Sequence, residues 1–268
     1  MGRVTTSNRR GVLRAGAGLI AGGTLATGCG ATGTGAPPPH PAANLVSATS
    51  TPTPTPAAST APAPRAFPGQ PLQITHGPRG AAAVALTFHG QGDPTLATRI
   101  LTTAEKRGAR LTVLAVGSWL DAHPAMARRI LDSGHDLGNH TQRHVSVNAM
   151  SESGARAEIT DCADRLRRLT GSIGSWFRPS RAPTASELVA RLAAEAGYPH
   201  VLSYDVDSLD YTRPGAAAVT RKVLAEVTGG SVVSMHFGYP DTADALPAVL
   251  EELDRRGLRA VTTTELLS

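Results

Sequence analysis

Residues 134–144 read Gly-His-Asp-Leu-Gly-Asn-His-Thr-Gln-Arg-His. The run 135–138 suits a short buried β-strand, and two histidines, His140 and His144, follow it directly. Side chains four residues apart can point the same way on one helical turn, so both imidazoles can reach one divalent cation. The same spacing also occurs in ordinary solvated turns, so the surrounding sequence has to decide between the two interpretations.

Strand-like and helix-like segments alternate on both sides of this stretch. Apolar β-type runs lie at 82–88, 111–116, 135–138, 176–178, 201–204, 231–236 and 259–262. Amphipathic segments lie at 96–106, 124–131, 152–169, 186–194, 216–227 and 245–256. Repeated strand–helix units with apolar strands are typical of a buried parallel sheet. The pattern predicts an α/β fold, a small and irregular barrel of about seven strands, with an open doubly wound sheet as the alternative.

Polar side chains follow five of the predicted strands. They are His89 and Asp93 after the first, His140 and His144 after the third, Arg178 after the fourth, Asp205, Asp207 and Asp210 after the fifth, and His236 at the end of the sixth. In either architecture the carboxyl ends of parallel strands meet on one side of the sheet. We therefore expect one functional site on that side.

Two appendages precede the predicted domain. Residues 1–30 combine Arg9-Arg10 with a short apolar stretch, which is typical of a twin-arginine export signal, and Cys29 lies in a possible lipoprotein cleavage box. Residues 31–71 are rich in Pro, Thr and Ala and predict an extended, disordered tether, leaving 72–268 as the folded domain. We expect an extracytoplasmic protein, either secreted to the cell wall or anchored to the membrane through a lipid at Cys29.

Composition narrows the function classes. The 268-residue chain carries a formal net charge of +5, but its arginines are scattered, so no nucleic-acid partner is expected, and no feature predicts a protein partner. A Gly-x-Ser-x-Gly sequence is absent, which argues against a serine esterase. Apart from Cys29 the only cysteine is Cys162, which is expected to be unpaired on the apolar face of a helix.

Six stretches, taken in order, resemble the signatures of the polysaccharide deacetylases, carbohydrate esterase family four of the NodB type. They are Ala85-Leu86-Thr87-Phe88, Val113 to Leu120, Gly134 to His144, Phe177-Arg178-Pro179, Asp207 to Tyr211 and Val232 to His236. The resemblance covers roughly residues 80–268. It implies a distorted (β/α) barrel of about seven strands. It also implies a metal-dependent hydrolase that removes N-acetyl groups from a polysaccharide such as peptidoglycan or a chitin-like glycan.

The resemblance also implies roles for particular residues. One divalent ion, with zinc the expected metal, would be held by His140, His144 and an aspartate of the first motif. A base from that motif would take a proton from water, and His236 would protonate the departing amine. Arg178 would orient the base, held by an aspartate of the segment 207–210, with Asp210 the expected catalytic partner.

The first motif departs from the family pattern. The family has two adjacent aspartates after Thr-Phe, where this chain has His89 and Gly90, followed by Gln91, Gly92 and Asp93. Our expectation is that a longer loop brings Asp93 into the metal position, leaving His89 as the base or as a third nitrogen ligand.

Two other functions stay open at this point. A domain that has lost its base would bind glycans without hydrolysing them, as a degenerate glycan-binding lipoprotein. A carbohydrate O-acetyl esterase would use the same machinery on an ester. Further along, Arg181 stands where the family has the tyrosine whose backbone amide binds the oxyanion, and Tyr211 stands where it has tryptophan, either as an aromatic wall or as a core residue.

Overall fold

The computed structural model describes residues 61–268. The expected export signal, Cys29 and residues 31–60 of the expected tether lie outside the described residues. The strands are β1 (Gln73–Ile74), β2 (Ala83–Gly90), β3 (Thr112–Ala115), β4 (Asp136–Asn139), β5 (Val201–Leu202), β6 (Val206–Asp207), β7 (Val232–His236) and β8 (Arg259–Val261). The α-helices are α1 (Pro94–Lys106), α2 (Gly117–Ala122), α3 (Ala125–Leu131), α4 (Glu152–Thr170), α5 (Glu187–Glu195), α6 (Ala216–Glu226), α7 (Pro240–Arg255) and α8 (Thr263–Leu266), with 3-10 turns η1 (Val147–Ala149) and η2 (Asp210–Thr212).

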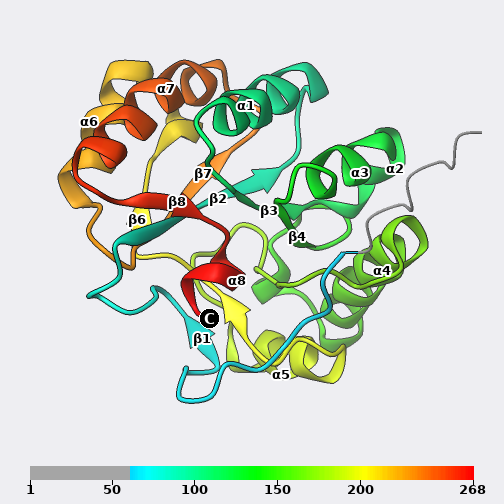
Figure 1. The fold of residues 1–268 in the computed structure, drawn as a ribbon. Helices are drawn as coiled ribbons and strands as arrows, with labels where there is room; N and C mark the ends of the chain where they lie inside the picture. Colours follow the sequence, from blue (N-terminus) through cyan, green and yellow to red (C-terminus); the bar gives the residue numbers. More distant parts are fainter. Residues whose placement is uncertain (1–60) are drawn as a thin grey trace, which may run out of the picture. The chain divides into compact units, whose positions relative to one another are not determined.

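Strand β2 is the centre of a six-stranded parallel sheet (Figure 1). The order is β4-β3-β2-β7-β6, and β8 also pairs with β2. Residues 85–89 of β2 pair with β7, while β3 pairs with 87–90 and β8 with 83–85, so these two strands share the opposite edge of β2. All eight residues of β2 are buried.

The sheet continues beyond β4 through single bridges rather than a full ladder. Phe177 bridges Asn139 on one side and Val201 of β5 on the other, and β5 pairs with β1. The run 176–178 was expected to be a strand, but pairing ends there because Pro179 has no N–H to donate. The curved parallel arrangement confirms the predicted α/β fold of the distorted-barrel type.

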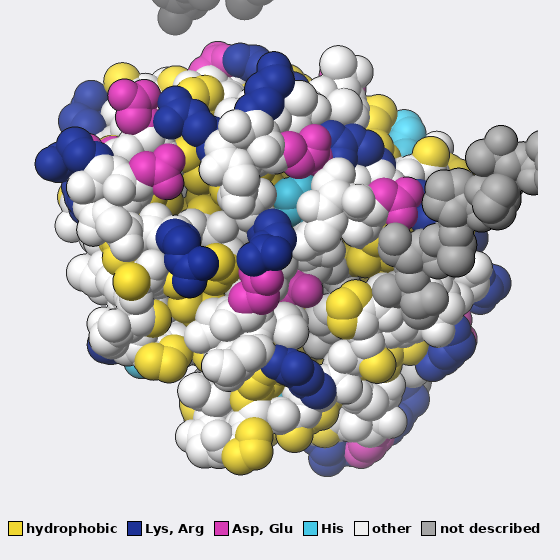
Figure 2. Space-filling model, in the orientation of Figure 1, with side chains coloured by type: hydrophobic (Ala, Val, Ile, Leu, Met, Phe, Trp, Pro, Cys, Tyr) yellow, Lys and Arg dark blue, Asp and Glu magenta, His cyan; other side chains and the backbone are white. Residues whose placement is uncertain are grey.

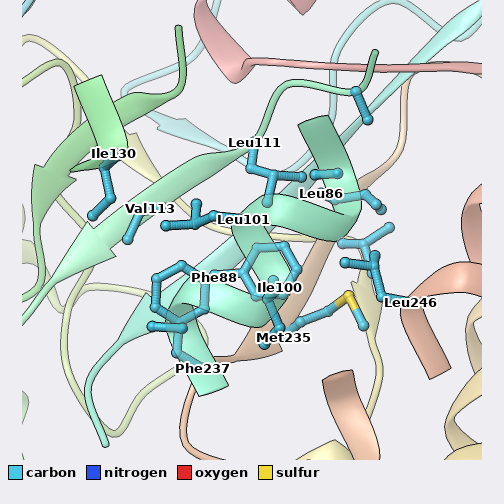
Figure 3. Packing of buried hydrophobic residues seen from close by; sticks show 14 of the residues in the cluster. Leu86, Phe88, Ile100, Leu101, Leu111, Val113, Ile130, Met235, Phe237 and Leu246 are labelled. Carbon is cyan, nitrogen blue, oxygen red and sulfur yellow. The ribbon is translucent and has the colours of Figure 1, made fainter. Parts of the chain in front are cut away.

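The two faces of the central strands differ in what they contact. Leu86 and Phe88 of β2 and Met235 of β7 point outward and pack on residues such as Ile100 of α1 (Figure 3). Figure 1 shows α1, α7 and α6 covering this side of the sheet. Because side chains alternate along a strand, Thr87 and His89 are left on the inner face. The inner face is therefore polar toward the carboxyl end of β2, while Ala83 and Ala85 keep it apolar at the other end.

Helix boundaries follow local capping chemistry. Asp93, Ser151 and Ser186 cap α1, α4 and α5 by accepting backbone N–H groups of the first turn. Helix α7 begins at Pro240 rather than near 245, since proline is tolerated in the first turn, where no N–H bond is needed.

Cys162 lies in α4, fully buried, as expected for an unpaired cysteine. Its burial raises the pKa of the thiol to about 12, so the residue is inert packing rather than a nucleophile.

The segment 61–71 belongs to the folded unit rather than to the tether. Ala61 is buried and its N–H bonds Thr170 O, and Phe67 stacks on Trp176 with ring centroids 5.3 Å apart. Phe67 N also donates to His200 Nε2 at 3.0 Å. The Pro- and Ala-rich composition concealed this packing, which depends on one aromatic ring. The folded part therefore starts about ten residues earlier than the predicted boundary at 72.

The surface of the described part carries mixed charge. Basic and acidic side chains are interspersed over the face shown in Figure 2, in line with ion pairs such as Arg99–Asp244 and Arg156–Glu195. Within residues 61–268 no helix is both long and apolar enough to cross a membrane.

Candidate active site

The site lies where β2, β4 and β7 end. His89 of β2 and His236 of β7 are register partners on adjacent parallel strands, and their ring centroids lie 4.3 Å apart. His140 follows β4 and is anchored by its backbone N–H to Ala115 O. The expectation that the strand ends bring these histidines together is met by this geometry.

Three imidazoles form a cluster, which we call the histidine cluster: His89, His140 and His144. One ring nitrogen from each lies within 4.8 Å of the others. His89 Nδ1 is 2.8 Å from His140 Nε2, and His140 Nδ1 is 3.1 Å from Arg178 O.

His140 and His144 do not share a helical turn, contrary to the expectation from their spacing. The segment between them is a loop, in which Thr141 and His144 both have positive φ (66° and 56°). Asn139 Oδ1 accepts the Thr141 N–H and stabilises this turn, as Asn side chains commonly do. The two rings nevertheless meet, with centroids 5.0 Å apart.

The cluster is electrically neutral at ordinary pH. Burial lowers the pKa of His89 and of His140 well below the usual range, and it lowers the pKa of His144 to about 4. Neighbouring imidazoles reinforce the shifts of His89 and His140. Because a metal ligand must be a neutral imidazole, three such nitrogens at this spacing fit a divalent ion.

Asp93, expected as a metal ligand and catalytic group, lies elsewhere. It is exposed at the start of α1, and its Oδ1 accepts the Thr95 N–H at 2.8 Å. Among residues 61–268, the group of side chains that could hold a metal ion contains His89 in its place. The physical reason is local: an aspartate just before Pro94 caps the helix more readily than it bends back to the sheet.

Asp210 partners His236, and this corrects the expected pairing with Arg178. The Asp210 side chain is fully buried, and its Oδ1 lies 2.6 Å from His236 Nδ1. Its Oδ2 accepts the His236 N–H at 2.8 Å and the Thr242 hydroxyl at 2.5 Å. Three short hydrogen bonds therefore fix the carboxylate and, through it, the orientation of the His236 ring.

Arg178 is fully buried and is held by neutral groups. Its Nε and Nη2 donate to Leu202 O at 3.0 Å and Ser203 O at 2.8 Å, and Nη1 donates to Thr87 Oγ1 at 2.9 Å. Burial lowers the pKa of Arg178 to about 10, and the nearby Tyr204 and Asp207 oppose this shift. Nη1 is also 3.5 Å from His89 Nε2, so the guanidinium faces an imidazole where the family has a carboxylate.

A cavity of about 340 Å³ opens over these residues. Its lining includes His89, His144, His236, Asp207, Ser234, Arg181, Gln91 and the three tyrosines Tyr204, Tyr211 and Tyr239. Tyr211 is 46% exposed and meets the His236 ring edge-on at a centroid distance of 5.5 Å, so it forms a wall of the cavity rather than part of the core.

Several residues of the site were not predicted. Ser234, whose Oγ is 3.1 Å from His89 Nε2, lies two residues before His236 on the same face of β7, and this period-two spacing was the available signal. Thr242 and Tyr239 come from the start of α7 and carry no comparable sequence signal. Asp205, a candidate by position, instead bonds Arg79 and the N–H of Val232.

Comparison with known proteins places this geometry in a family. A family model described as polysaccharide deacetylase matches residues 76–201. A peptidoglycan-N-acetylglucosamine deacetylase of Bacillus cereus is 30% identical over 194 residues, which are 71% of this chain and 90% of that protein.

Two kinds of solved structure share the fold. A peptidoglycan N-acetylglucosamine deacetylase in complex with an N-hydroxybenzamide has a TM-score of 0.68 and 26% identity, covering 73% of this chain and 92% of the other. A wild-type CE4 family pseudoenzyme from Bacillus anthracis has a TM-score of 0.70 and 24% identity, covering 74% and 70%. A mutant of that pseudoenzyme with restored enzymatic activity matches equally well, covering 74% and 72%. The chain belongs to the polysaccharide deacetylase family, hydrolases acting on carbon–nitrogen bonds other than peptide bonds.

Proposed function

We propose that this domain is a metal-dependent N-deacetylase acting on a cell-wall glycan, with peptidoglycan preferred over a chitin-like polymer. One observation carries the proposal: a cavity in which neutral imidazoles suited to a metal ion adjoin a histidine fixed by a buried carboxylate. The Bacillus cereus relative, 90% of which is spanned by this chain, supports the choice of glycan.

The metal ion would be held by His140 and His144 together with a third ligand from the β2 end. When bound, a divalent ion supplies a Lewis acid that polarises the acetyl carbonyl and makes water more acidic. His140 is oriented for this task because its Nδ1 can donate to Arg178 O, leaving Nε2 with a lone pair.

His236 is the residue that moves protons. Since Asp210 occupies its Nδ1, the nitrogen left for substrate is Nε2. In amide hydrolysis the water oxygen bonds to the acetyl carbon, the C–N bond breaks, and the proton removed from water must reach the amine. His236 Nε2 takes that proton and returns it to the leaving nitrogen, stabilised as an imidazolium by Asp210.

Arg178 and Thr87 position the β2 end of the site. The guanidinium donates to the carbonyls of Leu202 and Ser203 and to the hydroxyl of Thr87, which lies two residues before His89 on the same face of β2. Its charge also disfavours protonation of His89. Tyr204, Tyr211 and Tyr239 line the cavity with aromatic surface of the kind that packs against sugar rings.

A second function, glycan binding without turnover, is favoured by one observation. Position 89 is histidine and position 90 is glycine, and the cavity lining contains one carboxylate among the described residues, Asp207, which does not belong to the histidine cluster. If His236 does not serve as the base, this domain would hold a glycan and leave it intact.

Acetate release tests the proposal directly. The full chain is stripped of metal and assayed on peptidoglycan and on N-acetylglucosamine oligomers, before and after addition of zinc, cobalt or manganese. Release that requires metal and is lost in His140→Ala supports the deacetylase. Binding of glycan without release under any metal condition would establish the binding protein instead.

An O-acetylated glycan and an Asp93→Asn control complete the experiment. His236→Ala removes the base for both substrates, but an ester leaving group needs less protonation than an amine, so amide cleavage should fall more than ester cleavage. Faster release from the O-acetyl substrate by the unaltered chain would identify a carbohydrate O-acetyl esterase. Asp93→Asn keeps the helix cap and should keep activity.

We also infer an extracytoplasmic location with a lipid anchor at Cys29, which rests on the leader sequence alone. In cells that express the full chain, labelled fatty acid should become attached to the chain. This label should be absent from the Cys29→Ser variant. Secretion of an unlabelled chain into the medium would indicate ordinary export.

A further inference from the structure

We propose that His89 is the third metal ligand, so that the ion is held by three neutral imidazoles with no carboxylate. The inference rests on the proposed function and specifies its metal centre. It differs from the ligand set implied by the family resemblance, in which an aspartate of the first motif binds the ion.

The positions of the ring nitrogens support this assignment. His89 Nδ1 points at His140 Nε2 from 2.8 Å, and the nitrogens of the histidine cluster all lie within 4.8 Å of one another. Two imidazole nitrogens bound tetrahedrally at ~2.0–2.1 Å from zinc lie about 3.3 Å apart. A small outward movement of His89 and His140 therefore admits an ion between them.

The other nitrogen of His89 is held in the way that metal-ligating histidines usually are. Ser234 Oγ lies 3.1 Å from Nε2 and can accept the N–H of that nitrogen, whereas the Arg178 guanidinium, 3.5 Å away on the same side, is a donor only. This contact fixes the ring with Nδ1 toward the cluster. Since both nitrogens are engaged, His89 is poorly placed to act as the base on a substrate water.

At the described β2 end, neither position 90 nor Asp93 can supply a carboxylate as third ligand without a change in the backbone. A Cβ atom at Gly90 would lie 2.9 Å from Val113 Cγ1 and 3.0 Å from Ala115 Cα, so β3 crowds the position at which the family has a second aspartate. Asp93 is exposed and already caps α1. Among the described residues at the β2 end, His89 is the one whose side chain lies close enough to His140 and His144 to be the third ligand.

The ligand set determines the charge and the metal preference of the centre. Three neutral imidazoles leave the full 2+ charge of the ion, whereas a carboxylate would reduce it to 1+. Imidazole ligands suit zinc, cobalt, nickel and copper, while manganese and magnesium prefer oxygen ligands. The centre should therefore select zinc or cobalt over manganese and bind small anions such as acetate.

Metal binding to the full chain, measured without substrate, tests the inference. X-ray absorption of the zinc-loaded chain should show three imidazole nitrogens, and a competition titration should give one zinc per chain. In His89→Gln the affinity for zinc should fall at least 100-fold, with two imidazoles left. In Asp93→Asn the affinity should not change, and in Ser234→Ala it should fall about 10-fold because the ring loses its anchor.

Two results would overturn the inference. One is wild-type affinity in His89→Gln, and the other is a large loss of affinity in Asp93→Asn. Thermal unfolding of the metal-free variants shows whether each is folded. Failure of the proposed function can be told apart from failure of this inference. If the chain binds zinc through three imidazoles but releases no acetate, the inference stands and the proposed function is wrong. If acetate release depends on Asp93, the proposed function stands and the inference is wrong.

Discussion

The β7 end and the β2 end of the cavity carry buried charges of opposite sign. At the β7 end, Asp210 is a fully buried anion that accepts three hydrogen bonds, two of them from His236 and one from Thr242. At the β2 end, Arg178 is a fully buried cation bound to two carbonyls and a hydroxyl, and its neighbour is the neutral His89. The two strand ends are in register, so the backbone offers both positions equally. The difference shows that side-chain identity, not the fold, decides which buried charge each strand end carries.

The largest expected effect comes from breaking the β7 end. Asp210→Asn removes the negative charge that stabilises the His236 imidazolium and disturbs the orientation of the ring. The rate of acetate release should fall about 10³- to 10⁴-fold, as in other histidines deprived of a carboxylate partner. Kinetics on a soluble N-acetylated oligomer measure the fall.

Thr242→Val is the matched control for that change. It removes one hydrogen bond to Asp210 and keeps the charge, so it should lower the rate far less. Equal losses in both variants would mean that packing at the start of α7, rather than the charge of Asp210, supports the reaction.

A substitution of Arg178 at the β2 end should lower the stability of the fold. Arg178→Met leaves the carbonyls of Leu202 and Ser203 buried without donors, at a cost of about 1–3 kcal/mol each. We expect the free energy of unfolding of the metal-free chain to fall by about 3 kcal/mol, measured by urea titration. Arg255→Met, on the exposed face of α7, should change little. A variant as stable as the parent would show that the desolvation cost of the guanidinium outweighs its hydrogen bonds.

A carboxylate introduced at the β2 end would give both ends of the cavity a buried negative charge. His89→Asp places a negative charge near Arg178, and we expect the free energy of unfolding of the metal-free chain to rise by about 1 kcal/mol. A double-mutant cycle with Arg178→Met isolates the pair. If the gain persists without Arg178, it does not come from this pairing.

The smallest effect concerns a buried carboxylate far from the cavity. Asp136 accepts hydrogen bonds from Thr264 and Trp176, but burial raises the pKa of this carboxyl above its usual range. The folded state therefore binds the proton more tightly than the unfolded state, so this contribution to stability is present at low pH and is lost as pH rises from about 4 through the folded pKa. Urea titrations from pH 4 to 8 should show that the stability of the parent relative to Asp136→Asn falls with pH, and a constant difference would refute the assignment.

The fold could be predicted to a large extent from local pattern. The apolar runs placed β2, β3, β4 and β7 within a residue or two, because a buried parallel strand is apolar on both faces along most of its length. Strands β1 and β6 have two residues each, too few for a periodic signal. The packing of Phe67 on Trp176 joins segments more than 100 residues apart, which no window of sequence can show.

For the site, too, some features could be predicted from the sequence and others could not. Sequence identified His89, His140, His144, Arg178, Asp210 and His236 because each follows a strand, but it could not tell which of them pair. The expected link between Arg178 and Asp210 failed since Asp210, at the start of η2, lies against β7 and the first turn of α7. The expected return of Asp93 to the sheet was not found because capping α1 satisfies its carboxylate locally.

The sequence by itself determined the family, the parallel α/β architecture and the set of polar residues at the strand ends, because these depend on residue type and on spacing along the chain. The tertiary structure alone decided the partners: His236 with Asp210, His89 with His140 and Ser234, and Arg178 with the carbonyls of Leu202 and Ser203. Hydrogen bonds and charge interactions act over a few ångströms in space. Neighbours at that range come from strands distant in sequence, so their identity is fixed only when the sheet has formed.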